Sequence, residues 1–152
     1  MRLKSTKGIL AKFDLDTEGG LSGTINTTYT AYSAVDQREI YAGKDDGVNK
    51  IKYLNKNLPD WSIKELTVEN LDDAEKPLKE TITLSIENAA QINDERIYLK
   101  PTLQSGWEKN PFVSEKRAYP VEMPYPINDL YSLILTIPEG YSVEELPKNT
   151  RL

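Results

Sequence analysis

The spacing of apolar side chains near the start of the chain predicts a β-hairpin. Residues 9–15 carry an apolar side chain at every second position, and residues 21–31 repeat this two-residue period. Such alternation is typical of strands with one buried face. Between the two stretches lie Gly19 and Gly20, which can adopt the positive φ angles of a tight reversal. We therefore expect two antiparallel strands joined by a short turn.

The period then changes to that of a helix. Ser33 can cap a first helix that ends near Gly43. A second helix is expected to begin near Asp45 or Asp46 and to end before Pro59, with its apolar side chains on one stripe. Both helices are short, so we expect them to pack over one face or one end of a sheet.

The strand pattern returns after the helices. Apolar side chains change parity between Ile63 and Leu66, and a β-bulge near Lys64 or Glu65 would keep both on the same face. Further alternation follows in residues 78–86, 97–99 and 131–137, and a turn at residues 138–140 leads into a last apolar stretch at 141–146.

Together these patterns predict a mainly β protein. We expect an immunoglobulin-like, antiparallel β-sandwich of about seven or eight strands, with two short helices inserted after the first hairpin. The single domain is expected to span residues 9–147, with the helical insertion at about 33–58. Residues 1–8 are expected to form a disordered or artificially added tail, and residues 148–152 a C-terminal tail.

The composition excludes several classes of catalytic site, metal site and partner. The 152 residues include no cysteine and no histidine, which removes disulfides, Cys/His zinc sites and Ser-His-Asp or Cys-His catalysis. The 19 basic and 24 acidic residues give a formal net charge of -5, so nucleic acid is not an expected partner. Because no apolar stretch approaches the length of a membrane span, we expect no membrane insertion.

No catalytic, metal or cofactor site is predicted. Asp14–Gly19 begins like a calcium loop, but the twelfth position is Ile25, where such loops need a bidentate glutamate. Acid–base catalysis by two carboxylates would need a specific pair, and the sequence singles out none. We therefore expect a protein that is not an enzyme and that holds no cofactor.

Aromatic residues supply the candidate binding surface. The chain has two tryptophans and nine tyrosines, and such rings stack on sugars as well as filling a core. Trp107 follows Ser105 and Gly106 in an expected loop, while Tyr119 and Tyr125 flank a proline-rich segment that reads as a protected edge strand or an extended ligand. We take Trp107, Tyr119 and Tyr125 as the candidate ligand-binding or interdomain surface.

Several segments of the chain together carry a family resemblance. In the second half they are Asn110-Pro111-Phe112, Arg117-Ala118-Tyr119-Pro120-Val121, Tyr131–Ile137 and Ile137-Pro138-Glu139-Gly140-Tyr141-Ser142-Val143-Glu144-Glu145-Leu146-Pro147, and earlier ones are Gly19-Gly20-Leu21-Ser22-Gly23 and Tyr32-Ser33-Ala34 with Arg38. These segments resemble the C-terminal domain of unknown function in bacterial transglutaminase-like proteins. These are turn and strand signatures, so the resemblance carries over no functional residue. In such proteins an N-terminal β-domain and a papain-like core with a Cys-His-Asp triad precede this region.

The resemblance implies an accessory module. The chain would be the C-terminal part of a larger exported protein, located in the periplasm or cell envelope, and its partner would be the upstream transglutaminase-like core. We expect it to be a monomer when isolated. The alternative is a module that binds cell-wall glycan, which the aromatic content and the envelope location both favour.

Overall fold

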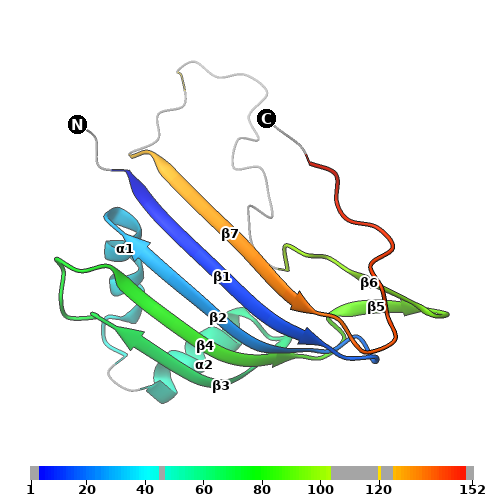
Figure 1. Cartoon of the computed structure of the whole chain (residues 1–152). Helices are drawn as coiled ribbons and strands as arrows, with labels where there is room; N and C mark the ends of the chain where they lie inside the picture. Colours follow the sequence, from blue (N-terminus) through cyan, green and yellow to red (C-terminus); the bar gives the residue numbers. More distant parts are fainter. Residues whose placement is uncertain (1–3, 45–46, 104–119, 121–124, 150–152) are drawn as a thin grey trace.

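Five strands form one mixed sheet in the computed structural model, which describes residues 4–44, 47–103, 120 and 125–149 (Figure 1). β7 runs parallel to β1, and the other neighbours in the sheet are antiparallel. In spatial order the strands are β3 (Trp61–Glu69), β4 (Leu78–Ile86), β2 (Leu21–Thr30), β1 (Ser5–Leu15) and β7 (Ile127–Thr136). A separate two-stranded ribbon contains β5 (Ala90–Asn93) and β6 (Arg96–Leu99).

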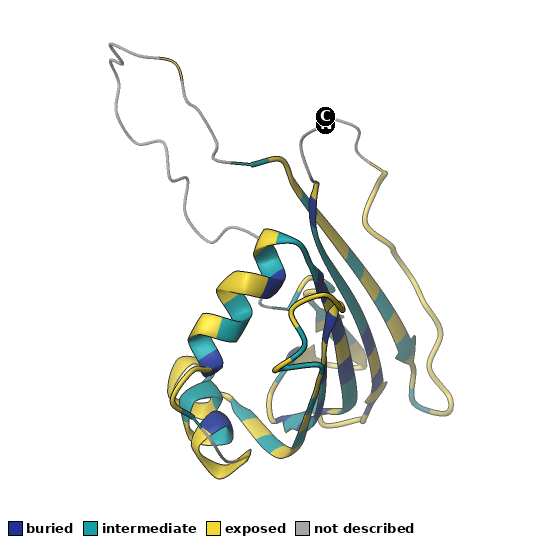
Figure 2. Cartoon of the chain, turned by 90° about the vertical axis from the view of Figure 1, so that its left-hand side faces the viewer, coloured by how far each residue is buried: buried dark blue, intermediate teal, exposed yellow. Residues whose placement is uncertain are grey.

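Two helices cover one face of this sheet. α1 (Tyr32–Tyr41) and α2 (Gly47–Asn57) both lie behind the strands in Figure 1, and the side view in Figure 2 places them together on one side. We call the helix-covered side the inner face and the opposite side the outer face. Among the described elements, none packs as a layer on the outer face, so the sheet presents that face to its surroundings.

The core lies on the inner face, where rows of apolar side chains cross the strands. Ala11 lies opposite Ile25, which in turn lies opposite Ile82, and all three are buried. Because side chains alternate along each strand, the outer positions of β2 and β4 hold polar residues, and all of them except Lys79 are short. Five of these are threonines, namely Thr24, Thr28, Thr30, Thr81 and Thr83.

The first hairpin is confirmed, and its turn has a clear local cause. The Asp16 carboxylate accepts hydrogen bonds from the backbone N–H groups of Glu18 and Gly20, each at 2.8 Å. Gly19 has a φ of 84°, and a Cβ there would approach the Ala90 carbonyl oxygen to 2.8 Å, so the position favours glycine. The acidic stretch therefore serves to close the turn.

The bulge predicted in β3 is also confirmed. The pairing of β3 with β4 shifts register between Ile63 and Glu65. As a result Ile63 and Leu66, which differ in parity along the sequence, both pack against the same core.

The start of α1 differs from the prediction. The helix begins at Tyr32 after Ala31, which has a φ of 51° and makes no side-chain cap. Ser33 does not cap the helix, because its hydroxyl lies 2.8 Å from the carbonyl oxygens of both Thr6 and Thr30. The serine instead ties the first turn of α1 to β1 and β2.

The immunoglobulin-like sandwich is not confirmed, since the sheet is open and its inner face is covered by two helices and the small β5–β6 ribbon in place of a second large sheet. Alternation along a strand reports that one face is covered, but not what covers it. The segment after Thr136 is extended and not paired as an eighth strand. At the other end, β1 begins at Ser5, within the stretch predicted as a tail, because Ser5 is in register with Ile127 of β7.

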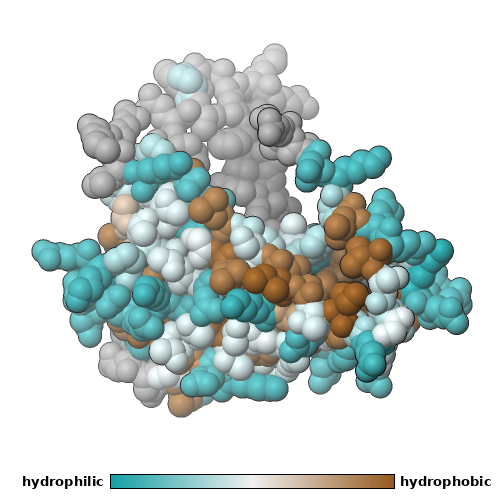
Figure 3. All heavy atoms as spheres, viewed as in Figure 1, coloured by the Kyte–Doolittle hydropathy of each residue, from teal (hydrophilic) through white to brown (hydrophobic). Residues whose placement is uncertain are grey.

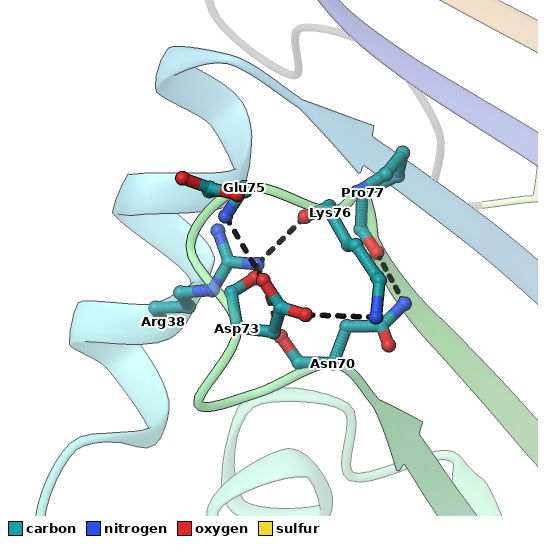
Figure 4. Close-up of polar contacts among 6 residues, drawn as sticks. All are labelled: Arg38, Asn70, Asp73, Glu75, Lys76 and Pro77. Atoms are coloured by element: carbon teal, nitrogen blue, oxygen red, sulfur yellow. Dashed lines mark hydrogen bonds and ion pairs between the residues drawn. The ribbon is translucent and has the colours of Figure 1, made fainter.

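Arg38 holds the β3–β4 loop against α1 (Figure 4). Its Nε donates to the carbonyl of Leu71 at 3.1 Å, and one terminal nitrogen lies within 3.0 Å of three further loop carbonyls, those of Asn70, Asp73 and Lys76. A guanidinium group suits this role because it spreads several donors over one rigid plane. The loop is thereby fixed beside the helix that covers the inner face.

Candidate functional site

Exposed apolar side chains concentrate in β7 and in the segment that follows it. Leu130 and Ile134 on β7 are 57% and 54% exposed, and Val143 and Leu146 beyond it are 57% and 72% exposed. We define the C-terminal apolar surface as Leu130, Ile134, Ile137, Tyr141, Val143 and Leu146. Figure 3 shows hydrophobic atoms gathered along β7 and over the segment after it. Apolar patches of this kind are typical of interaction sites.

The alternation of β7 explains why Leu130 and Ile134 are exposed. Tyr131, Leu133 and Leu135 point inward and pack against the core, so the residues between them point outward. Leu130 lies opposite Gly8 of β1, and a Cβ built at Gly8 meets no atom within 4 Å. The neighbouring strand therefore offers Leu130 no side chain to pack against.

A turn directs the rest of the surface away from β7. The Tyr141 N–H donates to the Pro138 carbonyl at 3.2 Å, and Gly140 has a φ of 86°. This is the pattern of a type II turn, which splays the two arms instead of holding them as a hairpin. The segment then runs past β6, where Glu144 forms an ion pair with Arg96 at 3.1 Å (Figure 1). Tyr141, Val143 and Leu146 remain exposed as a result.

Of the three residues predicted as a binding surface, the structure describes only Tyr125. Its ring stacks on Tyr32, with centroids 4.5 Å apart and planes 13° from parallel. Its hydroxyl donates to Asp36 Oδ2 at 2.8 Å, and this hydrogen bond raises the pKa of Tyr125. Trp107 and Tyr119 lie outside the described residues.

The partner in this stack, Tyr32, was not predicted. Its position at the start of α1 marks it as a helix residue, and sequence spacing gives no sign that Tyr125 would reach it. The stack joins the entry of β7 to the first turn of α1. Tyr32 itself is 47% exposed, so the pair forms an aromatic spot at the surface.

A second site that sequence reasoning missed is a buried carboxylate, Glu80. Tyr29 donates to its Oε1 at 3.4 Å, Gln37 donates to its Oε2 at 3.3 Å, and Tyr41 also donates to Oε2. Lys50 lies near, with its Nζ 5.9 Å from the centre of the Tyr41 ring. The sequence did contain a signal for it. Every second side chain of a strand points to the same face, and Glu80 lies between residues 78 and 82, which point inward.

Burial controls the protonation of this cluster. Loss of solvent raises the pKa of Glu80, although the tyrosine hydroxyls and Lys7 oppose the shift. The pKa values of Tyr29 and Tyr41 are raised as well, mainly by burial and then by the Glu80 charge. Each fully buried side-chain nitrogen or oxygen atom of the described residues has a hydrogen-bond partner. The cluster therefore acts as a satisfied polar core between α1 and the sheet.

Other classes of site find little support in the described residues. They contain no group of three acidic side chains arranged to hold a metal ion. None of the helices that the structure describes is long and apolar enough to cross a membrane.

Comparison with known protein families finds a match for part of the chain. Residues 95–152 match the family described as "Domain of Unknown Function with solved-structure structure" (DUF3858), and nothing in that match links the chain to transglutaminase-like proteins. No curated protein and no solved structure matches the chain. The matched residues include β6, β7 and the whole of the C-terminal apolar surface.

Proposed function

We propose that the chain is a non-catalytic interaction module that docks another domain of a larger, transglutaminase-like envelope protein. The observation that carries this proposal is the C-terminal apolar surface, whose six side chains come from one continuous stretch of chain. The stretch lies wholly within residues 95–152, which match DUF3858. Docking would remove this apolar area from water, which is favourable.

The titratable groups support a role without catalysis. Glu80 has the most buried carboxylate among the described residues, and its hydrogen-bond partners are two buried tyrosines and the partly buried Gln37. Its raised pKa follows from burial inside the fold, and structural clusters commonly produce such shifts.

The first test is the mass of the native polypeptide that carries this sequence, measured by peptide-specific antibody and mass spectrometry on fractionated cells. The proposal expects a species in the envelope fraction that is much larger than 17.2 kDa. A species of about this mass would overturn it.

The second test measures docking directly. We expect Leu130→Ser with Ile134→Ser to weaken binding of the chain to the separately expressed upstream part of the parent by about 30-fold, since the two lost contacts are worth on the order of 2 kcal/mol. The matched control is Val48→Ser with Ile92→Ser, because those residues are similarly exposed but lie on α2 and β5. Calorimetry gives both affinities, and equal weakening by the two pairs would contradict the assignment.

Glycan binding is a second candidate, and the exposed Tyr32–Tyr125 stack is the observation that favours it. Aromatic faces and edges at a surface suit the C–H groups of sugars. We expect Tyr32→Ala to reduce retention of the chain on cell-wall material if this function operates, while Tyr98→Ala, at an equally exposed tyrosine of β6, leaves retention unchanged. Equal retention of all three proteins in a pull-down would remove this candidate.

A further inference from the structure

The two edge strands of the sheet differ in how they are protected from further pairing. β3 carries a bulge at Ile63/Glu65 and has exposed charges at Lys64, Glu65 and Glu69. Bulges and charges are the usual devices that prevent an edge from adding another strand. β7 has an unbroken register with β1 over residues 127–136, contains no proline, and carries one charged residue, Asp129.

The backbone of β7 shows which groups the open edge offers. The Ser5 N–H donates to the carbonyl of Pro126 at 3.0 Å, so even-numbered residues of this strand face β1. Backbone groups alternate in direction along a strand, and those of Asp129, Tyr131, Leu133 and Leu135 therefore point to the open side. Within the described part of the chain, no hydrogen bond to these N–H groups is formed by another element.

From this edge we propose that β7 pairs antiparallel with β7 of a second copy of the chain, joining two sheets into one. Two-fold symmetry requires a self-complementary strand. A register centred on Ser132 places Leu130 of each copy opposite Ile134 of the other. It also pairs the open-side backbone groups, 131 with 133 and 129 with 135, as hydrogen-bonded pairs.

Charge and spacing favour this register. The two Asp129 residues fall at opposite ends of the paired strands, so like charges do not meet. Leu130 and Ile134 fall in non-hydrogen-bonded pairs, where facing side chains approach most closely. In the two registers shifted by two residues, Leu130 would face Ser132 or Thr136, and Ile134 would face Asn128 or Ser132. Both apolar side chains would then lie opposite polar ones.

This inference goes beyond the proposed docking function and departs from the monomer expected from the sequence. Pairing uses the open backbone edge of β7 with Leu130 and Ile134 as facing side chains, whereas docking uses the outward side chains of the whole C-terminal apolar surface. The C-terminal segment turns away from β7, forms an ion pair with β6 through side chains that are 62% and 68% exposed, and among the described residues makes no backbone hydrogen bond with this edge.

Sedimentation of the full chain over a concentration series tests the proposal. We expect the mass to approach twice 17.2 kDa as concentration rises. A mass that stays at that of one chain up to about 1 mM would overturn the proposal.

Two double variants test the register. Leu130→Lys with Ile134→Lys sets lysine against lysine, and should raise the dimer dissociation constant about tenfold or more over that of Leu130→Glu with Ile134→Lys, which sets glutamate against lysine. Circular dichroism confirms that both fold. Equal dissociation constants for the two variants would overturn the proposed pairing. The Glu/Lys variant also lacks the apolar docking side chains, so a dimer that fails to dock separates this proposal from the proposed function.

A proline substitution tests the backbone pairing at the open edge of β7 separately from the side chains. Asp129→Pro removes an open-side N–H and leaves the hydrogen bonds between β1 and β7 in place, because proline is tolerated where the N–H of an edge strand faces outward. The proposal expects this variant to dimerise more weakly than the wild type while its circular dichroism spectrum stays unchanged. A dimer as tight as the wild type would count against edge pairing.

Discussion

Glu80→Ala should lower the free energy of unfolding by roughly 3 kcal/mol, because it leaves two buried tyrosine hydroxyls without their acceptor. Tyr29 and Tyr41 both donate to this carboxylate, and both are buried between the sheet and α1. Chemical denaturation followed by circular dichroism measures the loss. The matched control is Glu65→Ala, which removes an exposed carboxylate from β3 and should change stability by less than about 0.5 kcal/mol. Similar losses in both variants would show that the buried cluster contributes nothing special.

The same residue gives a pH dependence whose sign follows from its raised pKa. The folded protein holds the Glu80 proton more tightly than the unfolded chain, where the ordinary pKa is 4.5. Its contribution to stability is therefore fully present below pH 4.5 and is lost as the pH rises through the folded pKa. Glu80→Gln removes the titration, so stability relative to this variant should fall as the pH rises from 4.5. A difference that grows in the opposite direction would contradict the raised pKa.

Local patterns predicted the first hairpin and the β3 bulge because both depend on neighbouring residues. Gly19 permits the turn, and the change of parity between Ile63 and Leu66 requires an extra residue. The packing of the two helices over a face of the sheet was predicted, but their taking the place of a second large sheet was not, since an inward apolar face packs equally well on helices or on a second sheet. The parallel pairing of β1 with β7 joins the two ends of the chain, and no periodicity reports such a contact.

The candidate sites also divide into features that neighbouring residues determine, which the sequence predicts, and features that depend on contacts between distant segments, which it does not. Tyr125 could be proposed as a surface aromatic, but its stacking on Tyr32 depends on where α1 meets β7. Ile134 gave a usable signal, because it is an apolar residue at an outward position of its strand. Glu80 gave the converse signal, a charged residue at an inward position. Mismatches between residue type and strand parity thus mark the β7 part of the apolar surface and the buried carboxylate.

A chain reduced to residues 95–152, the part that matches DUF3858, is expected to be unfolded. It contains β6 and β7, and each of these pairs with a strand outside it: β6 with β5, and β7 with β1. Unpaired strands have no means to bury their apolar face or to satisfy their backbone groups. The proton–nitrogen NMR spectrum of this fragment should show the narrow dispersion of an unfolded chain, whereas the full chain should show a dispersed spectrum.

Adding back the missing strands should restore the fold. Residues 1–94 supply β1, β2, β3, β4 and β5, so mixing the two fragments should return the dispersed spectrum of the full chain if β7 finds β1. The control is an N-terminal fragment that carries Ala11→Asp, which places a charge at a fully buried position of β1 and should prevent recovery. A dispersed spectrum and cooperative unfolding from residues 95–152 alone would contradict the sheet order, because β7 would then need no partner from the N-terminal strands. Recovery that requires residues 1–94 would instead place the structural unit across the boundary of the DUF3858 match, with the C-terminal apolar surface held in place by β1.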